Sequence, residues 1–214
     1  MNYSIQACGV GKRFRDIWVL KDINVSFEYG KIYGLIGRNG SGKTMLLRII
    51  SGLASPSEGI VKVEGKVLGI DCETPDSIGA IIETPGFLPN ETGLANLVYL
   101  ACLRSRIGKD RCEEAMTLCG LDPASKKKVG KYSLGMRQRL GIAQAIMESP
   151  HILLLDEPMN GLDNEGVRDI KKLLNNVRDL GNTIIIASHH MDDISELCDE
   201  VYYMDGGKLN KRAI

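Results

Sequence analysis

The fold of this chain is decided by the stretch Gly37-Arg38-Asn39-Gly40-Ser41-Gly42-Lys43-Thr44. It fits the pattern G-x-x-x-x-G-K-[ST] and lies between an apolar run at 31–36 and a run with helical spacing at 45–50. A glycine-rich loop between a strand and a helix points several backbone N–H groups, and the positive end of the helix dipole, at one spot. The sequence therefore predicts a phosphate-binding loop.

The residue types within this loop suit a nucleotide that carries a metal ion. Lys43 supplies a positive charge within reach of the outer phosphates, and the Thr44 hydroxyl is placed to ligate Mg²⁺. The rest of the stretch is expected to surround the phosphates: Gly37, Arg38, Asn39, Gly40, Ser41 and Gly42. The alternative is an ordinary glycine-rich turn before a helix, which the preceding strand and the Gly-Lys-Thr ending disfavour.

The bulk properties indicate a globular chain with a core and no excess of basic charge. The 214 residues are 43% hydrophobic and 25% charged, with 27 basic and 27 acidic side chains, so nothing argues for nucleic acid as a partner. No apolar run is long enough to cross a bilayer, and residues 1–6 do not have the form of a signal peptide. The six scattered cysteines indicate reduced thiols in a cytoplasmic protein.

Hydrophobic periodicity predicts an α/β fold in which a helical block interrupts the strands. The expected strands are 4–10, 17–27, a small hairpin at 60–68, 78–83, 151–156, 183–188 and 201–204. The expected helices are 92–107, 111–119, 133–147, 165–180 and 191–198. We therefore predict one domain, 1–214. Its catalytic α/β core with a β subdomain spans 1–86 and 150–214, and its inserted α-helical subdomain spans 87–149.

Acidic residues at the end of a second apolar strand supply the other half of the predicted site. Asp156 closes the strand and could hold Mg²⁺ directly or through water. Glu157, the next residue, is a candidate general base that polarises the attacking water. The alternative is a pair of solvent-exposed carboxylates at a strand end, an interpretation that the phosphate loop makes weaker.

A histidine follows the next strand along the chain. His189 comes directly after residues 183–188 and could contact the γ-phosphate or hold the attacking water. The adjacent His190 leaves the choice between the two open, and a surface histidine is the alternative to both. We favour His189 because it lies nearest the carboxyl edge of the sheet, where parallel strands place their ligands.

A family resemblance follows from the stretch Tyr132-Ser133-Leu134-Gly135-Met136-Arg137-Gln138. It resembles the signature motif of ABC ATPases, LSGGQ, which a basic-Gln-basic run follows. The phosphate loop, the Asp156 site, residues 160–163 and the Ser188-His189 pair follow the same family's order over nearly the whole chain. The resemblance implies a phosphate-loop NTPase fold with a RecA-like, mostly parallel sheet, ATP and Mg²⁺ as ligands, and ATP hydrolysis with Lys43, Glu157 and His189 as catalytic residues.

The resemblance also implies a head-to-tail dimer of two ATP-binding subunits, identical or different. Each ATP would lie between one phosphate loop and the partner's signature, which in this chain consists of Ser133, Gly135 and Met136. The free N–H groups of a helix start suit such an anion. Phe14 falls where the family places an aromatic residue on adenine, with Val19 lining the same face, although core or turn packing is an alternative for Phe14.

One departure from the family pattern narrows the resemblance. Most members carry Gln where this chain has Glu83, a further candidate Mg²⁺ ligand that adds negative charge beside the triphosphate; its alternative is a solvent-exposed side chain. Glu83 with the following Pro85-Gly86-Phe87 and the unusual signature resembles the ATPases of bacitracin and lantibiotic exporters and immunity systems. Many of these continue past the last strand, whereas this sequence ends at Ile214.

These features favour the interpretation that the chain is the ATP-hydrolysing subunit of an exporter. Its ATP hydrolysis would power the transport of antimicrobial peptides or related compounds through a separate integral membrane permease. The surface that begins at Phe87 and Leu88 is where the family receives a cytoplasmic helix of that permease. The protein would then be cytoplasmic and peripheral on the inner face of the membrane. The alternatives are a soluble ABC-type ATPase that acts on nucleic acid or ribosomes, and an ATP-switched sensor or immunity module.

Overall fold

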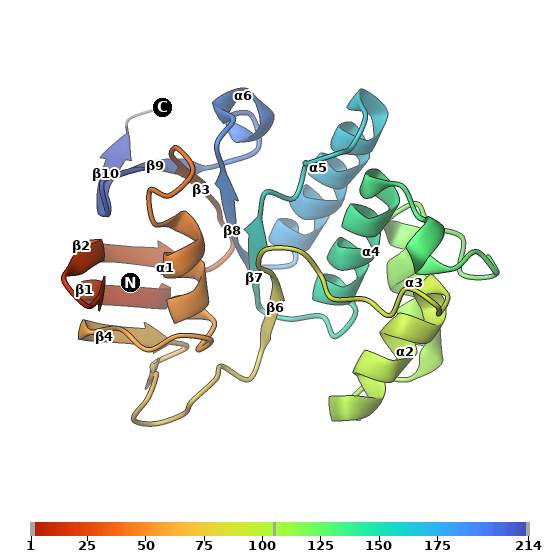
Figure 1. Cartoon of the computed structure of the whole chain (residues 1–214), viewed down its shortest axis with the longest axis horizontal. Helices are drawn as coiled ribbons and strands as arrows, with labels where there is room; N and C mark the ends of the chain where they lie inside the picture. Colours follow the sequence, from red (N-terminus) through yellow and green to blue (C-terminus); the bar gives the residue numbers. More distant parts are fainter. Residues whose placement is uncertain (1–2, 105, 213–214) are drawn as a thin grey trace.

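The computed structural model describes residues 3–104 and 106–212, and it contains two β-sheets (Figure 1). The first sheet is antiparallel, with the order β2-β1-β4-β5. Its strands are β1 (Tyr3–Phe14), β2 (Ile17–Glu28), β4 (Glu58–Val63) and β5 (Lys66–Val67). The second sheet has the order β10-β9-β3-β8-β7-β6 and is parallel except for β10. Its strands are β3 (Ile32–Ile36), β6 (Ile78–Ile81), β7 (Ile152–Asp156), β8 (Thr183–Ser188), β9 (Glu200–Asp205) and β10 (Lys208–Arg212).

The helices flank the parallel sheet. Helix α1 packs between the two sheets, whereas α2 to α5 lie beyond the opposite face (Figure 1). Their bounds are α1 (Lys43–Ile50), α2 (Gly93–Arg104), α3 (Lys109–Leu118), α4 (Leu134–Ile146), α5 (Asn164–Asp179) and the short α6 (Met191–Ile194), with a 3-10 turn at Val129–Lys131. In the described residues, no helix is both long and apolar enough to cross a membrane.

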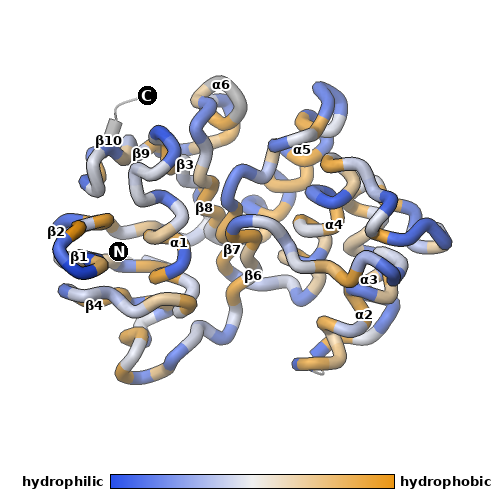
Figure 2. Tube along the Cα trace, in the orientation of Figure 1, coloured by the Kyte–Doolittle hydropathy of each residue, from blue (hydrophilic) through white to orange (hydrophobic). Residues whose placement is uncertain are grey.

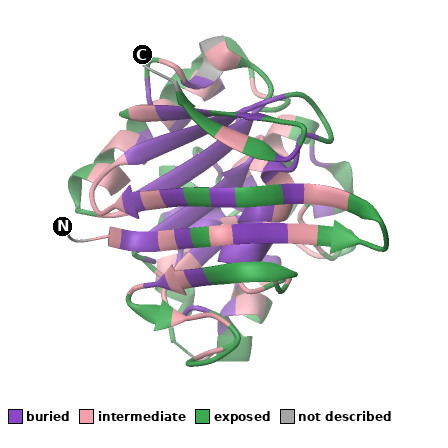
Figure 3. Ribbon diagram, turned by 90° about the vertical axis from the view of Figure 1, so that its left-hand side faces the viewer, coloured by how far each residue is buried: buried purple, intermediate pink, exposed green. Residues whose placement is uncertain are grey.

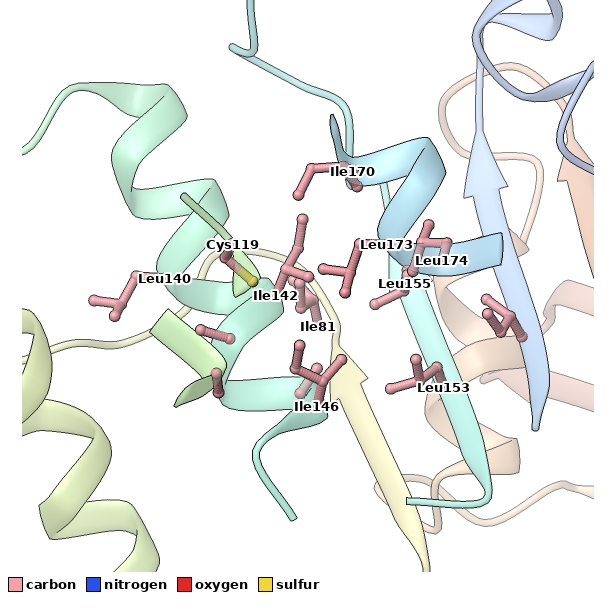
Figure 4. Close-up of a cluster of buried hydrophobic side chains, with 14 of the residues drawn as sticks. Ile81, Cys119, Leu140, Ile142, Ile146, Leu153, Leu155, Ile170, Leu173 and Leu174 are labelled. Atoms are coloured by element: carbon pink, nitrogen blue, oxygen red, sulfur yellow. The ribbon is translucent and has the colours of Figure 1, made fainter. Parts of the chain in front are cut away.

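The central strands are apolar throughout because both faces of the sheet are covered. Every residue of β3, β7 and β8 is buried, and the trace through β7 and β8 is among the most hydrophobic in Figure 2. Side chains alternate between two cores. Leu153 and Leu155 of β7 face the helical core, where Ile142 of α4 and Leu174 of α5 meet them (Figure 4).

The other face of β7 turns toward α1 and the antiparallel sheet. Ile152 and Leu154 join a second core that includes Leu46 of α1 and Phe27 of β2. Figure 3 shows buried residues along the strands of this antiparallel sheet, interrupted by exposed ones. This alternation is typical of a sheet with one covered and one solvated face.

The expected α/β fold is confirmed, but several elements differ from their predicted bounds. Helix α2 ends at Arg104 and not at residue 107, and β1 continues to Phe14, beyond the predicted strand 4–10. A tenth strand, β10, was missing from the sequence prediction; it pairs with β9 across the turn at Gly206-Gly207. The predicted helix 191–198 is wrong beyond Ile194, because α6 has four residues. The predicted strand 78–83 ends at Ile81, so that Glu83 lies beyond β6 in a left-handed conformation.

Strand β6 and helix α4 approach so closely that only glycine fits between them. A Cβ added at Gly79 would lie 1.9 Å from the carbonyl oxygen of Ala145 and 2.8 Å from Cγ of Pro150. We expect Gly79→Ala to lower the free energy of unfolding by about 3 kcal/mol, because strand and helix must move apart. Chemical denaturation measures this loss.

Gly86→Ala is the matched control, since a Cβ there meets no atom within 4 Å and its φ is not positive. Its free energy of unfolding should stay within about 0.5 kcal/mol of the wild-type value. Equal losses in the two variants would contradict the packing argument.

Candidate ATP site at the carboxyl edge of the parallel sheet

The phosphate loop runs from the end of β3 into α1 and is shaped by close packing. A Cβ added at Gly37 would lie 2.2 Å from the carbonyl oxygen of Met204, and one at Gly42 would lie 2.7 Å from Cδ2 of Leu20. Gly42 also has a φ of 114°, which side chains other than that of glycine rarely adopt. At Gly40, by contrast, a Cβ would meet nothing within 4 Å. The loop is therefore closed toward the protein and open on the side where phosphates would lie.

Two buried polar side chains of the loop fit an anionic ligand. Lys43 is 5% exposed, and its ammonium donates to the carbonyl oxygens of Gly37 at 2.6 Å and Arg38 at 3.3 Å. Burial lowers the pKa of Lys43, an effect that the charges of Glu157 and Asp156 oppose. The buried hydroxyl of Ser41 has no hydrogen-bond partner in the described residues. A phosphate oxygen in the loop would satisfy both groups.

The predicted metal-binding pair is formed across two elements. The Thr44 hydroxyl, at the start of α1, donates a hydrogen bond of 2.7 Å to Asp156 Oδ2 at the end of β7. Burial raises the pKa of the Asp156 carboxyl, while hydrogen bonds from Thr44 and from the backbone N–H of Glu83 act against that rise. Two oxygen donors at one point suit Mg²⁺, which usually takes few protein ligands beside phosphate oxygens and water.

No metal site made of protein ligands alone competes with this pair. Among the residues that the structure describes, no group of three or more His, Cys, Asp or Glu side chains could hold a metal ion. The Glu83 carboxylate, a further candidate ligand, is instead 3.3 Å from the guanidinium of Arg48, and its side chain is 61% exposed. It is the main chain of Glu83 that hydrogen-bonds to Asp156.

The predicted base and histidine are in direct contact. Glu157 Oε1 lies 2.7 Å from Nδ1 of His189, and Ser188 Oγ donates to Glu157 Oε2 at 3.3 Å. Glu157 itself has a φ of 51°, an uncommon conformation that turns its side chain out of the line of β7. The ring of His190 instead packs against that of His189 in a tilted arrangement, with 3.8 Å between ring centroids. Of the two histidines, His189 is thus the one in contact with Glu157.

The predicted adenine-side residues lie on the hairpin of β1 and β2. Val19 lines the same hollow of about 420 Å³ as residues 39–45, Asp156 and Glu157. Phe14, at the end of β1, lies outside that lining, is 52% exposed, and has the Lys12 ammonium 5.2 Å from its ring centroid. The exposure of the ring excludes core packing for Phe14 and leaves its face available for stacking.

The signature residues occupy a different part of the surface. Ser133 caps α4 by accepting a 3.2 Å hydrogen bond from the backbone N–H of Met136. Ser133, Gly135 and Met136 line a second hollow of about 640 Å³, which shares no lining residue with that of the phosphate loop. The structure therefore brings together the phosphate loop, Asp156, Glu157 and His189, whereas Ser133, Gly135 and Met136 of the same chain line a separate hollow. Leu134 and Gln138, from the same stretch, line a third hollow together with Asp156 and Glu157.

Three contacts of the site escaped the sequence analysis. The Ser188 hydroxyl donates to the carboxylate of Glu157, and the Gln138 amide donates to the backbone carbonyl of Glu157. The third contact is the ion pair between Arg48 and Glu83. The spacing of Arg48, one helical turn after Thr44, could have indicated that it faces the same site. Nothing local in the sequence indicates the contact of Gln138, because β7 and α4 meet only in the folded chain.

Comparison with known proteins agrees with this geometry. The family described as ABC transporter matches residues 20–160. An uncharacterized ABC transporter ATP-binding protein of Bacillus subtilis, YybJ, is 44% identical over 96% of this chain and 94% of its own length. The bacitracin transport ATP-binding protein BcrA of Enterococcus faecalis is 42% identical over 98% of this chain and 68% of its own length. The dimeric bacterial ABC transporter cassette MJ0796 has the same fold, with a TM-score of 0.87 at 24% identity, covering 98% of this chain and 100% of that one.

The fold and the loop define the class of the protein as a phosphate-loop ATPase. The family match and the two relatives then show that the chain belongs to the ABC transporter family, as an ATP-binding subunit. The alternative of a soluble ATPase that acts on nucleic acid or ribosomes is not favoured.

Burial of the Asp156 carboxyl disfavours its charged form, and the effect on stability can be measured. Burial raises its pKa, so the folded chain binds the proton more tightly than the unfolded chain does. The contribution of Asp156 to stability therefore increases as the pH falls through its raised pKa. We expect Asp156→Asn to raise the free energy of unfolding at pH 7.5 by about 1 kcal/mol, and this advantage to shrink at pH 4.5.

Urea denaturation of the nucleotide-free protein at the two pH values measures this difference. The control is Glu114→Gln on the exposed face of α3, which should change stability by less than about 0.5 kcal/mol. A loss of stability in Asp156→Asn at pH 7.5 would contradict the argument.

Proposed function

We propose that this chain hydrolyses ATP to power export through a separate membrane permease. The observation that carries the ATP chemistry is the convergence of the phosphate loop, Thr44–Asp156 and Glu157–His189 at the ends of three neighbouring strands, β3, β8 and β7. The likeness to a bacitracin transport protein over 98% of the chain supports antimicrobial peptides or related compounds as cargo.

In this proposal, the phosphate loop binds and orients the triphosphate. Lys43 leaves its carbonyl partners for phosphate oxygens, the N–H groups of residues 37–42 donate to the same anion, and Phe14 and Val19 bound the adenine side. Thr44 and Asp156 hold Mg²⁺, and the bound ion would neutralise negative charge on the outer phosphates. Because the loop glycines are fixed by packing, little reorganisation accompanies binding.

Glu157 then acts as the general base. A carboxylate 2.7 Å from the His189 ring can accept the proton of a water molecule while the ring holds that water or the γ-phosphate in line. The Ser188 hydroxyl and the Gln138 amide fix the position of Glu157 from two other elements. His189 and Ser188 are thus placed to orient the base as much as the ligand.

The separation of the two hollows supports a dimer. We propose that Ser133, Gly135 and Met136 meet the γ-phosphate bound by a partner subunit, whose signature completes the site of this chain in the same way. The start of α4 offers backbone N–H groups to an anion there. ATP would hold the two chains together, and hydrolysis would release them.

A surface beside the site suits the permease. Phe87 and Leu100 help to line an apolar hollow of about 270 Å³, and Leu88 and Tyr99 nearby are each 52% exposed. We propose that residues 87–149 form a helical subdomain and that a cytoplasmic helix of the permease docks against this hollow. The chain would then be peripheral on the cytoplasmic face of the membrane.

The base assignment is tested by Glu157→Gln. This variant keeps the size and the hydrogen-bonding edge of the side chain but cannot accept the proton, so turnover should fall by at least about 100-fold. ATP should still bind, and dimers should accumulate with it in size-exclusion chromatography. Glu114→Gln is the control with normal turnover, and normal turnover in Glu157→Gln would disprove the assignment.

The permease is tested by purification of the tagged protein from membranes of its own host. A stoichiometric multi-spanning membrane protein should accompany the wild-type chain, and less of it should accompany a Phe87→Asp variant. Nucleic acid or ribosomal proteins in its place would contradict the transport proposal while leaving the ATP chemistry intact.

A further inference from the structure

Two side chains of helix α1, one helical turn apart, contact acidic residues at or beyond the ends of other strands of the sheet. Thr44 and Arg48 are four residues apart and so share a face of the helix. Thr44 donates to Asp156 at 2.7 Å, and the Arg48 guanidinium lies 3.3 Å from the Glu83 carboxylate. The second contact joins the phosphate-loop helix to the segment after β6.

The main chain and the side chain of Glu83 have different partners, Asp156 and Arg48. Its backbone N–H donates to the Asp156 carboxylate, while its own carboxylate is turned to Arg48. A φ of 62° accompanies this arrangement, a left-handed conformation that is uncommon for a residue with a side chain. The ion pair therefore fixes a carboxylate that would otherwise be free to turn toward the metal-binding pair.

The charges around the hollow explain why such control is needed. Three carboxylates line it, those of Glu83, Asp156 and Glu157, and a triphosphate would add further negative charge. The cations in the described lining are Lys43 and Arg48. Lys43 interacts with Asp156 and Glu157, which leaves Arg48 as the counter-charge of Glu83.

We propose that Arg48 is a positioning residue for nucleotide binding: it neutralises Glu83 and keeps its carboxylate away from the phosphates. The inference rests on the proposed ATP site and adds to it the reason why a glutamate is tolerated there. Arg48 acts through Glu83, so its effect on nucleotide affinity depends on the charge at position 83.

A double-mutant cycle tests this dependence. The measured quantity is the dissociation constant of a non-hydrolysable, fluorescent ATP analogue with Mg²⁺, so that turnover does not enter. Arg48→Met should weaken binding about threefold at low salt, the range expected for an exposed ion pair. The same substitution in a Glu83→Gln background should leave the dissociation constant unchanged, because no carboxylate remains to be neutralised.

Three controls separate charge from structure. Arg48→Lys should retain most of the affinity, and Arg111→Met, on the exposed face of α3, should retain all of it. The threefold effect of Arg48→Met should also shrink as salt is raised, because both partners are solvent-accessible.

An equal loss of affinity from Arg48→Met in the wild-type and the Glu83→Gln backgrounds would overturn the inference, since Arg48 would then act on the nucleotide directly. An unchanged dissociation constant in Arg48→Met alone would overturn it as well. Failure of the wild-type chain to bind the analogue at all is a distinct result, which would overturn the proposed ATP site itself.

Discussion

The hydrogen bond between Thr44 and Asp156 joins the phosphate loop to the acidic residues at the end of β7. It can form because β3, β8 and β7 are neighbours in one parallel sheet. Ile36 is in register with Ser188, and Ala187 with Asp156. The loops that follow these strands therefore leave the sheet at the same edge, which is where ligands bind in open α/β sheets. A register shift in any of the three would separate Thr44 and Asp156 from Glu157.

The residues that the proposed ATP chemistry needs at this edge of the sheet lower the stability of the fold. Lys43 and Asp156 are both buried. Burial lowers the pKa of Lys43 and raises the pKa of Asp156, so it favours the neutral form of each side chain. The left-handed conformations of Glu83 and Glu157 add backbone strain beside them. The hydrophobic cores on both faces of β7 stabilise this arrangement, since Leu153 and Leu155 pack on one side and Ile152 and Leu154 on the other. A nucleotide would relieve part of this cost by giving Lys43 and Ser41 phosphate oxygens as partners.

The strands, and the position of the candidate catalytic residues at the strand ends, were predictable because their causes are local. Runs such as 152–156 and 183–188 are apolar almost without interruption, and the acids and the histidine follow directly after them. The hairpin of β10 was missed because its strand, Lys208–Arg212, is mostly polar and lies at the edge of the sheet, where it pairs with β9 alone. Helix α6 was predicted too long, since the chain continues after Ile194 as a turn in which the N–H groups of Leu197 and Cys198 donate to the carbonyl oxygen of Ile194.

The contacts of Arg48 and Gln138 were not predictable for a different reason. Each joins elements that are far apart in sequence, Arg48 with Glu83 and Gln138 with Glu157. The spacing of Arg48 from Thr44 indicates which face of α1 it lies on, but it does not identify Glu83 as its partner. The sequence predicted an unusual charge at Glu83, but only the fold identifies its counter-charge.

In the proposed dimer, each ATP lies between the phosphate loop of one chain and the signature residues of its partner. The ATPase rate per chain of the isolated protein tests this arrangement when it is measured over a wide range of protein concentration, with light scattering alongside. The account predicts a rate per chain that rises with concentration and levels off as dimers form. A constant rate per chain over a range in which the protein stays monomeric would contradict it.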